Sequence, residues 1–284
     1  MRKETKKLID EFRNEYMCEG AAASRIIKPY VEFIGEEVME QAASALLLGE
    51  NLLLSGAKAT GKNVLAENLA WMFRRPVYTV SFNANTDSSA LIGTDTFKGG
   101  EVKLRPGVVS EAAVNGGFCI LDEINMAKND AVAVLHSVLD YRRLIDVPGY
   151  ELIPVHPATR FIATMNYGYA GTRELNEALV SRFSVIRMPA LSEERLAMLL
   201  KREAEGASEA EVKSCVGLFM DLNEKAINGE ISPNAVDLRG LITALKLIEN
   251  GMAARDAVTM CITNKCFDDY EHTLVDDIVM SRFA

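Results

Sequence analysis

The sequence has few cysteines, few histidines and no long apolar run, and each scarcity excludes a class of protein. The 5 cysteines among 284 residues are scattered without a Cys-x-x-Cys pair, so neither a disulfide framework nor a zinc site is expected. The 3 histidines lie far apart, and we expect them to be structural rather than metal ligands or catalytic bases. The longest apolar stretches, residues 42–48 and 118–121, are too short to span a bilayer.

The start of the chain and its net charge also limit the possible partners. Met1 is followed by charged residues rather than by the apolar core of a secretory signal. The formal net charge is −9, which disfavours nucleic-acid binding because an acidic surface repels phosphate backbones. We therefore expect a cytoplasmic protein with reduced thiols, no membrane span and no nucleic-acid partner.

The middle of the chain alternates short apolar segments with helix-like ones. Segments typical of strands lie at residues 51–55, 77–82, 118–121, 161–165 and 185–188. Helix-like segments lie at residues 64–73 and 131–139, after the first and third of these strands. Such alternation indicates a mostly parallel sheet with helices on both faces. After Leu191 the strand signals stop, and four helices and a short fifth one near the end are expected.

We therefore predict an α/β fold in three parts. Residues 1–27 are expected to form an N-terminal helical extension, residues 28–190 an α/β core, and residues 191–284 an all-helical lid subdomain. Two segments of the core, residues 93–108 and 142–156, contain Gly-Gly or Pro-Gly between short extended runs. Their turn chemistry predicts two inserted β-hairpins.

A glycine-rich segment between the first strand and its helix matches a phosphate-binding P-loop. It consists of Gly56, Ala57, Lys58, Ala59, Thr60, Gly61, Lys62 and Asn63. Its backbone N–H groups and the following helix N-terminus would hold phosphates, and Lys62 would reach the β- and γ-phosphates of ATP. Asn63 stands where the pattern has Ser or Thr, whose hydroxyl ligates Mg²⁺. We expect the Asn63 amide oxygen to take that place.

Two further polar groups follow apolar strands. Asp122 and Glu123 end the strand at residues 118–121, where only the carboxyl end of a buried strand can present charge to a ligand. Asp122 would hold Mg²⁺ or its water shell, and Glu123 would act as general base toward the attacking water. Asn166 follows the strand at residues 161–165, and it would help to place that water.

The order of these motifs resembles the MoxR-type AAA+ ATPases, over about residues 30–265. The P-loop is followed by an inserted hairpin, Leu-Asp-Glu-Ile-Asn, a second hairpin, Ala-Thr-Met-Asn and a segment that ends in Ser-Arg-Phe at residue 183. The segment at residues 169–179 is especially similar to the CbbQ/NorQ branch. The family often has Pro after the sensor Asn, whereas this chain has Tyr167.

The resemblance implies roles that spacing alone does not. Arg182 would be the arginine finger, which reaches the γ-phosphate bound to the adjacent subunit. Arg239 would be the second sensor arginine, with Arg202 as a weaker competitor for that role. The assembly would be a homo-oligomeric ring, most simply a hexamer, whose hairpins face a protein client and a partner with a von Willebrand A domain. The expected activity is ATP hydrolysis coupled to remodelling or activation of that client.

Two alternatives stay open at this point. Asn63 favours a nucleotide-gated scaffold that hydrolyses ATP slowly, and equal phosphate release by the protein and its Glu123→Gln variant would support it. A small basic loop of Lys98, Lys103 and Arg105 favours a DNA-acting AAA+ protein. Salt-dependent DNA binding that is lost on charge reversal in that loop would identify this second alternative.

Overall fold

The computed structural model describes residues 1–166 and 173–283. The chain divides into two compact units, Met1–Pro189 and Ala190–Ala284. Within the described residues no helix is long and apolar enough to cross a membrane. All five cysteines are free.

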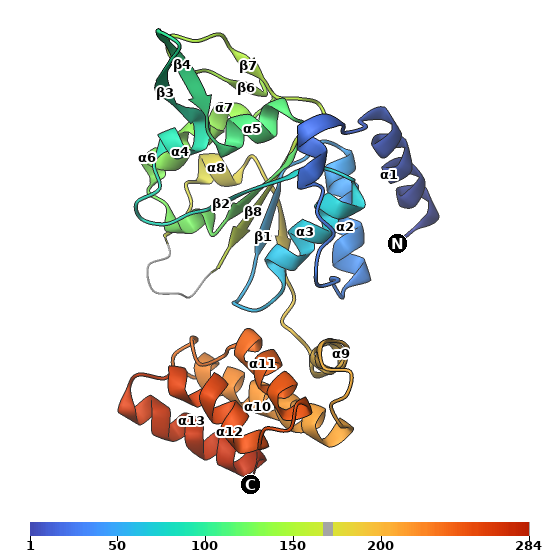
Figure 1. Ribbon diagram of the computed structural model, residues 1–284, viewed down its shortest axis with the longest axis vertical. Helices are drawn as coiled ribbons and strands as arrows, with labels where there is room; N and C mark the ends of the chain where they lie inside the picture. Colours follow the sequence, from blue (N-terminus) through green and yellow to red (C-terminus); the bar gives the residue numbers. More distant parts are fainter. Residues whose placement is uncertain (167–172, 284) are drawn as a thin grey trace. The chain divides into compact units, whose positions relative to one another are not determined.

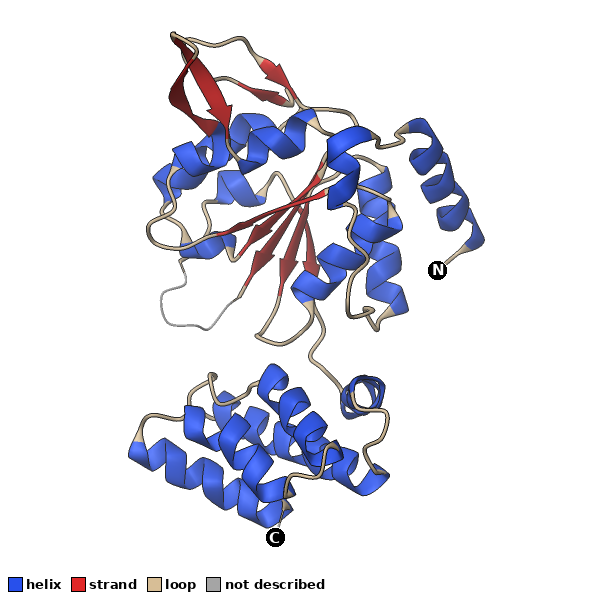
Figure 2. Ribbon diagram, viewed as in Figure 1, coloured by secondary structure: helices blue, strands red, loops and turns tan. Residues whose placement is uncertain are grey.

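A five-stranded parallel sheet forms the centre of the first unit (Figures 1 and 2). Its strand order is β2-β5-β8-β1-β9. The strands are β1 (Leu52–Ser55), β2 (Val77–Ser81), β5 (Phe118–Asp122), β8 (Arg160–Met165) and β9 (Ser184–Arg187). The prediction of a parallel sheet flanked by helices is confirmed.

The alternating side chains of these strands feed two separate apolar layers, one on each face. Leu52 and Leu54 of β1 belong to one layer, whereas Leu53 belongs to the other. The same alternation holds in β5, where Ile120 and Leu121 lie in different layers. Because the central strands are covered on both faces, they are largely apolar, whereas the edge strand β2 carries the exposed Thr79.

Helices cover both faces of the sheet (Figure 2). One face packs against helices from before and just after β1, including the N-terminal helix, whose Ile9 and Phe12 are buried there. These helices are α1 (Lys3–Glu15), α2 (Glu36–Leu47) and α3 (Lys62–Met72), with the 3-10 helix η1 (Gly20–Arg25) between the first two. The remaining helices of this unit are α4 (Ser88–Ile92), α5 (Val108–Val114), η2 (Ile124–Met126), α6 (Asn129–Val132), η3 (Ala133–Leu135), α7 (His136–Leu139) and α8 (Glu177–Val180).

The segment at residues 131–139 differs from the single helix that the sequence predicts. It is divided among α6, η3 and α7. Val132, Val134 and Val138 are β-branched, and such side chains lose rotamer freedom against the preceding helical turn. The apolar spacing of residues 131–139 predicts a buried helical face, but it does not indicate where the helix tightens into a 3-10 turn.

Two antiparallel hairpins extend from the first unit, and they lie beside each other (Figure 1). The first pairs β3 (Gly93–Lys98) with β4 (Glu101–Pro106). The second pairs β6 (Leu144–Ile145) with β7 (Ile153–Pro154). The Tyr150 hydroxyl of the second donates a hydrogen bond of 2.8 Å to Asp95 Oδ1 of the first. The two insertions are therefore joined to each other as well as to the core.

The second unit consists of helices alone in its described part (Figure 2). Its elements are α9 (Glu193–Glu203), α10 (Glu209–Ile227), α11 (Leu238–Glu249), α12 (Ala254–Cys261), η4 (Thr263–Lys265) and α13 (Asp269–Arg282). The expectation that the last helix is short is wrong, because α13 has 14 residues. Asp268 caps its first turn by accepting from the Glu271 amide, and Val275 and Val279 are buried along it.

A buried arginine supports the amino end of the sheet. Arg160, at the start of β8, is 5 % exposed. Its guanidinium donates to the carbonyl oxygens of Leu46 (2.6 Å), Pro157 (2.7 Å) and Thr159 (2.9 Å). Burial lowers the pKa of Arg160 to about 10, so the side chain still carries its charge at neutral pH.

We expect Arg160→Met to destabilise the protein by about 2–4 kcal/mol, because buried carbonyl groups would lose their donors. Urea unfolding followed by circular dichroism measures the change. Lys7→Met, at a side chain of α1 that is 76 % exposed, is the matched control and should unfold with the wild-type midpoint. Equal midpoints for Arg160→Met and wild type would contradict a supporting role for this guanidinium.

Candidate functional site

The predicted P-loop connects β1 to α3 at the carboxyl end of the sheet. Gly61 precedes α3 with a φ of 82°, and Ala59 has a φ of 65°. Residues with positive φ in a turn help to point successive N–H groups toward one concavity. A Cβ atom on Gly56 would lie 2.9 Å from Cβ of Met188, so only glycine fits there without displacement. The loop therefore has the form of a phosphate cradle at a helix N-terminus.

Lys62 is the desolvated cation of this loop. Its residue is 7 % exposed, and its ammonium donates to the carbonyl oxygens of Gly56 (3.0 Å) and Ala57 (2.7 Å) and to Thr60 Oγ1 (3.4 Å). Burial lowers the pKa of Lys62 to about 8, and the nearby carboxylates of Asp122 and Glu123 partly oppose that shift. A buried cation among neutral oxygens would gain more from an anionic ligand than from its present acceptors.

Asp122 and Glu123 are linked through a hydroxyl of the neighbouring strand. Thr164 donates from Oγ1 to Asp122 Oδ1 at 2.6 Å, and the same oxygen accepts from the Glu123 backbone N–H at 2.9 Å. Glu123 has a φ of 55°, which turns the chain out of β5 directly after Asp122. Asp122 is therefore the last residue of the strand, and Glu123 begins the turn that follows it.

Asn166 contacts Glu123, the carboxylate predicted to act as the general base. Its Nδ2 donates to Glu123 Oε1 at 2.9 Å. Asn125 in turn donates from Nδ2 to the Asn166 carbonyl oxygen at 2.7 Å, and the Arg173 amide donates to the Asn125 carbonyl oxygen at 3.0 Å. This chain of contacts orients the Asn166 amide toward the carboxylate with which it was predicted to act.

Thr164 and Asn125 are the two residues of this cluster that motif reasoning did not single out. Both lie inside quoted motifs, Ala-Thr-Met-Asn and Leu-Asp-Glu-Ile-Asn. The strand register identifies Thr164. Leu121 of β5 pairs with Ala163 of β8, so the residues that follow them, Asp122 and Thr164, lie side by side. No comparable sequence signal identifies Asn125.

The residues predicted to hold Mg²⁺ are Asp122 and Asn63. Asn63 lies in the first turn of α3 and is half-buried. Among the described residues no group of three or more His, Cys, Asp or Glu side chains forms a metal site by itself. Such a sparse donor set fits Mg²⁺ in nucleotide sites, which keeps several waters and shares phosphate oxygens with one or two protein ligands.

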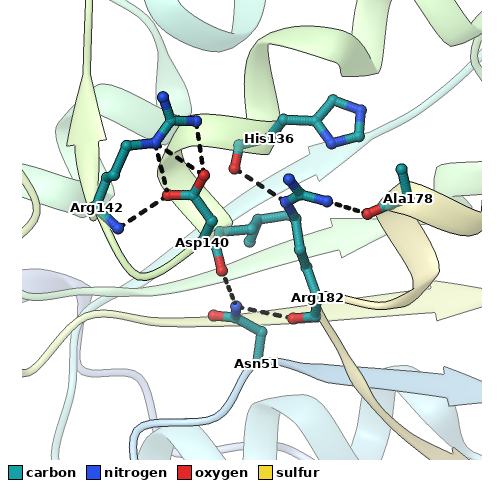
Figure 3. A network of polar contacts seen from close by, with 7 residues as sticks. Asn51, His136, Asp140, Arg142, Ala178 and Arg182 are labelled. Carbon is teal, nitrogen blue, oxygen red and sulfur yellow. Dashed lines mark hydrogen bonds and ion pairs between the residues drawn. The ribbon is translucent and has the colours of Figure 1, made fainter.

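Arg182 lies at the opposite end of the same sheet. It lies two residues before the start of β9, where Ser184 pairs with Leu52, whereas the P-loop follows Ser55. About 13 Å of strand therefore separates it from the loop. Its Nε donates to the His136 carbonyl oxygen at 3.2 Å, and its guanidinium also donates to the Ala178 carbonyl oxygen (Figure 3).

Two other expectations concern the helical unit and a segment outside the described residues. Arg239 is the second residue of α11 in the helical unit, and its side chain is exposed. Its role toward a nucleotide stays a prediction, as does that of Arg202 in α9. In the segment on which the CbbQ/NorQ resemblance depends, residues 169–172 lie outside the described residues.

Comparisons with known proteins agree with this geometry. The model of the AAA domain of the dynein-related subfamily matches residues 51–183. The uncharacterized protein YojN of Bacillus subtilis is 34 % identical over 253 residues, which cover 87 % of this chain and 83 % of YojN. An uncharacterized protein of Staphylococcus haemolyticus is 32 % identical over 254 residues, covering 87 % of this chain and 96 % of that protein.

Solved structures share the fold at low sequence identity. A candidate ATPase from Cytophaga hutchinsonii has a TM-score of 0.50 at 15 % identity, over 98 % of this chain and 96 % of its own. A mutant of RuvB from Thermotoga maritima has a TM-score of 0.53 at 18 % identity, over 84 % of this chain and 73 % of its own. The chain therefore belongs to the same family as YojN and its staphylococcal relative, and its residues 51–183 match the AAA domain.

Proposed function

We propose that this protein is a MoxR-type ATPase that hydrolyses ATP in a homo-oligomeric ring, most simply a hexamer, and uses the cycle to remodel or activate a protein client. The observation that carries the proposal is the contact of Asn166 with Glu123 beside Asp122 and the desolvated Lys62. A cation, a metal-binding carboxylate, a base and a water-orienting amide are the parts that phosphoryl transfer to water requires.

In this mechanism each side chain has a separate task. Lys62 binds the β- and γ-phosphates as a cation, and the loop amides hold the remaining phosphate oxygens. Asp122 and Asn63 hold Mg²⁺, which when bound neutralises the charge that develops on the phosphates. Glu123 accepts the proton of the attacking water, while Asn166 fixes the orientation of both.

The distance between Arg182 and its own P-loop supports assembly. An arginine at the amino end of the sheet cannot reach a phosphate at the carboxyl end of the same chain. It can serve a nucleotide bound to a neighbouring copy, where a guanidinium stabilises transition-state charge. Arg239 would then report the nucleotide state to the helical unit.

The joined hairpins are the surface that we assign to the client. Phe97 and Val102 form a cross-strand pair with exposures of 75 % and 61 %, and Leu152 on the second hairpin is 55 % exposed. Exposed apolar residues on a small insertion suit a protein contact. Lys103 is paired with Glu101 at 3.1 Å, which weakens the basic loop on which the DNA-acting alternative depends. A client with a von Willebrand A domain partner remains the MoxR expectation.

A scaffold that binds ATP and hydrolyses it slowly is the second candidate function, and Asn63 is the observation that favours it. The Asn63 amide oxygen does not lie at the same position as a Ser or Thr hydroxyl, and the octahedral geometry of Mg²⁺ tolerates a displaced ligand badly. The two candidates share nucleotide binding and differ in turnover.

Glu123→Gln should lower steady-state phosphate release by about 10²-fold or more and leave ATP binding intact, because it removes the base and keeps the shape. Malachite-green phosphate assays and equilibrium ATP binding measure the two properties. Glu111→Gln, at a residue of α5 whose side chain is 41 % exposed, is the control. Equal rates for Glu123→Gln and wild type would support the scaffold and sink the ATPase proposal.

ATP affinity should fall as the pH rises above about 8, because the phosphates bind the protonated form of Lys62 and its pKa is lowered to about 8. Proton linkage gives a dissociation constant about tenfold higher at pH 9 than at pH 7. Titration with a fluorescent ATP analogue measures it. Lys62→Met should bind more weakly at every pH and show no such trend. A wild-type affinity that does not change over this range would contradict the assigned contact.

Asn63→Ser should lower the Mg²⁺ concentration for half-maximal hydrolysis by about tenfold, because it restores a hydroxyl ligand. Asn63→Ala should raise that concentration, since it offers no ligand. Phosphate release across a Mg²⁺ titration measures both. Three identical Mg²⁺ curves would show that residue 63 is not a metal ligand.

A further inference from the structure

Asn51 is a buried polar residue that the mechanism above does not use. It directly precedes β1 and is 5 % exposed. Its Nδ2 donates to the carbonyl oxygens of Leu139 at 3.0 Å and of Arg182 at 3.1 Å (Figure 3). Because both neighbours are acceptors, the amide must present its NH₂ group to them.

The two contacts join three elements at the amino end of the sheet. Leu139 is the last residue of α7, and Arg182 lies between α8 and β9. The Asn51 carbonyl oxygen accepts from the Ser184 amide at 2.8 Å, so the same residue also begins the pairing of β1 with β9. A single side chain thus fixes the backbone of Arg182 relative to the strand that leads to the P-loop.

The guanidinium of Arg182 contacts α7, the helix to which the backbone of Arg182 is joined through Asn51. Its Nε donates to the carbonyl oxygen of His136, the first residue of α7. The backbone of residue 182 is held to the last residue of that helix through Asn51. Both the backbone and the guanidinium of Arg182 are therefore joined to α7, and the guanidinium also donates to Ala178 of α8.

Packing alone does not account for an amide at this position. Asn51 Oδ1 is buried without a hydrogen-bond partner among the described residues, and an unpaired buried acceptor lowers stability. An apolar side chain would fill the space without that penalty. What the amide provides is two N–H donors, and one of them binds the carbonyl oxygen of Arg182.

We propose that Asn51 is a positioning residue for Arg182, which it holds in the place from which the arginine serves the nucleotide of the adjacent subunit. This inference rests on the proposed trans role of Arg182. It adds that Asn51, directly before the strand that leads to one site, positions the arginine that serves the next site. Nucleotide binding by the subunit's own P-loop does not need Asn51.

The test compares Asn51→Ala with Arg182→Ala in full-length protein, by ATP affinity, phosphate release, and phosphate release after mixing with excess Glu123→Gln protein. Asn51→Ala should bind ATP within about twofold of wild type and hydrolyse it about 10- to 100-fold more slowly, the loss typical of a slightly misplaced group. Glu123→Gln subunits carry an intact Asn51 and Arg182. Mixed in excess, they should restore the rate per Asn51→Ala subunit to that of wild-type subunits mixed in the same way. The same recovery is expected for Arg182→Ala.

Thr159→Ala is the matched structural control. Thr159 is fully buried, and its hydroxyl also donates to two carbonyl oxygens, those of Ala112 (3.1 Å) and Ala113 (3.2 Å). Its loss should leave the hydrolysis rate per folded molecule unchanged. If Asn51→Ala does not fold, Asn51→Leu, which fills the space without the donors, enters the same assays.

The outcomes separate the two proposals. Wild-type hydrolysis by the Asn51 variant overturns the inference, and so does a loss that mixing does not recover while that of Arg182→Ala is recovered. If Arg182→Ala itself hydrolyses at the wild-type rate, or is not recovered by mixing, the proposed trans arginine fails instead.

Discussion

The burial of a parallel sheet on both faces is the constraint from which the rest of this structure follows. Leu52, Leu53 and Leu54 alternate between two apolar layers, so no side chain in the middle of the strand can be polar without a buried partner. Polar chemistry is thereby moved to the strand ends. Within the buried strand β8, Thr164 is 1 % exposed, and its hydroxyl donates to Asp122 Oδ1 and accepts from the Glu123 amide.

The two ends of the sheet carry different sets of predicted site residues. In the proposed mechanism the carboxyl end gathers Lys62, Asp122, Glu123 and Asn166 for nucleotide binding and water activation, and a neighbouring copy supplies a further cation. The amino end holds Arg182 on carbonyl groups of its own chain. In the proposed ring the two ends complete each other between copies, so that hydrolysis depends on assembly.

Much of this was predictable from sequence because the relevant signals are local. A strand, a glycine-rich turn and a helix follow one another within residues 51–73, and Asp122 and Asn166 stand directly after apolar runs. What could not be predicted depends on register and tertiary contact. From the sequence, Asn51 is the polar first residue of the strand predicted at residues 51–55, whereas its side-chain hydrogen bonds reach residues 88 and 131 positions away. The subdivision of the helix at residues 131–139 and the length of α13 were likewise missed, because periodicity reports a buried face more reliably than it reports ends.

The central claim is that each catalytic site is completed by another copy of the chain. Its most direct test is phosphate release per subunit at saturating ATP and Mg²⁺ along a dilution series, with assembly followed by light scattering. A shared site predicts that specific activity rises together with assembly and then reaches a plateau. Specific activity that stays constant while the assembly dissociates to monomers would show that one chain suffices, and would contradict the account.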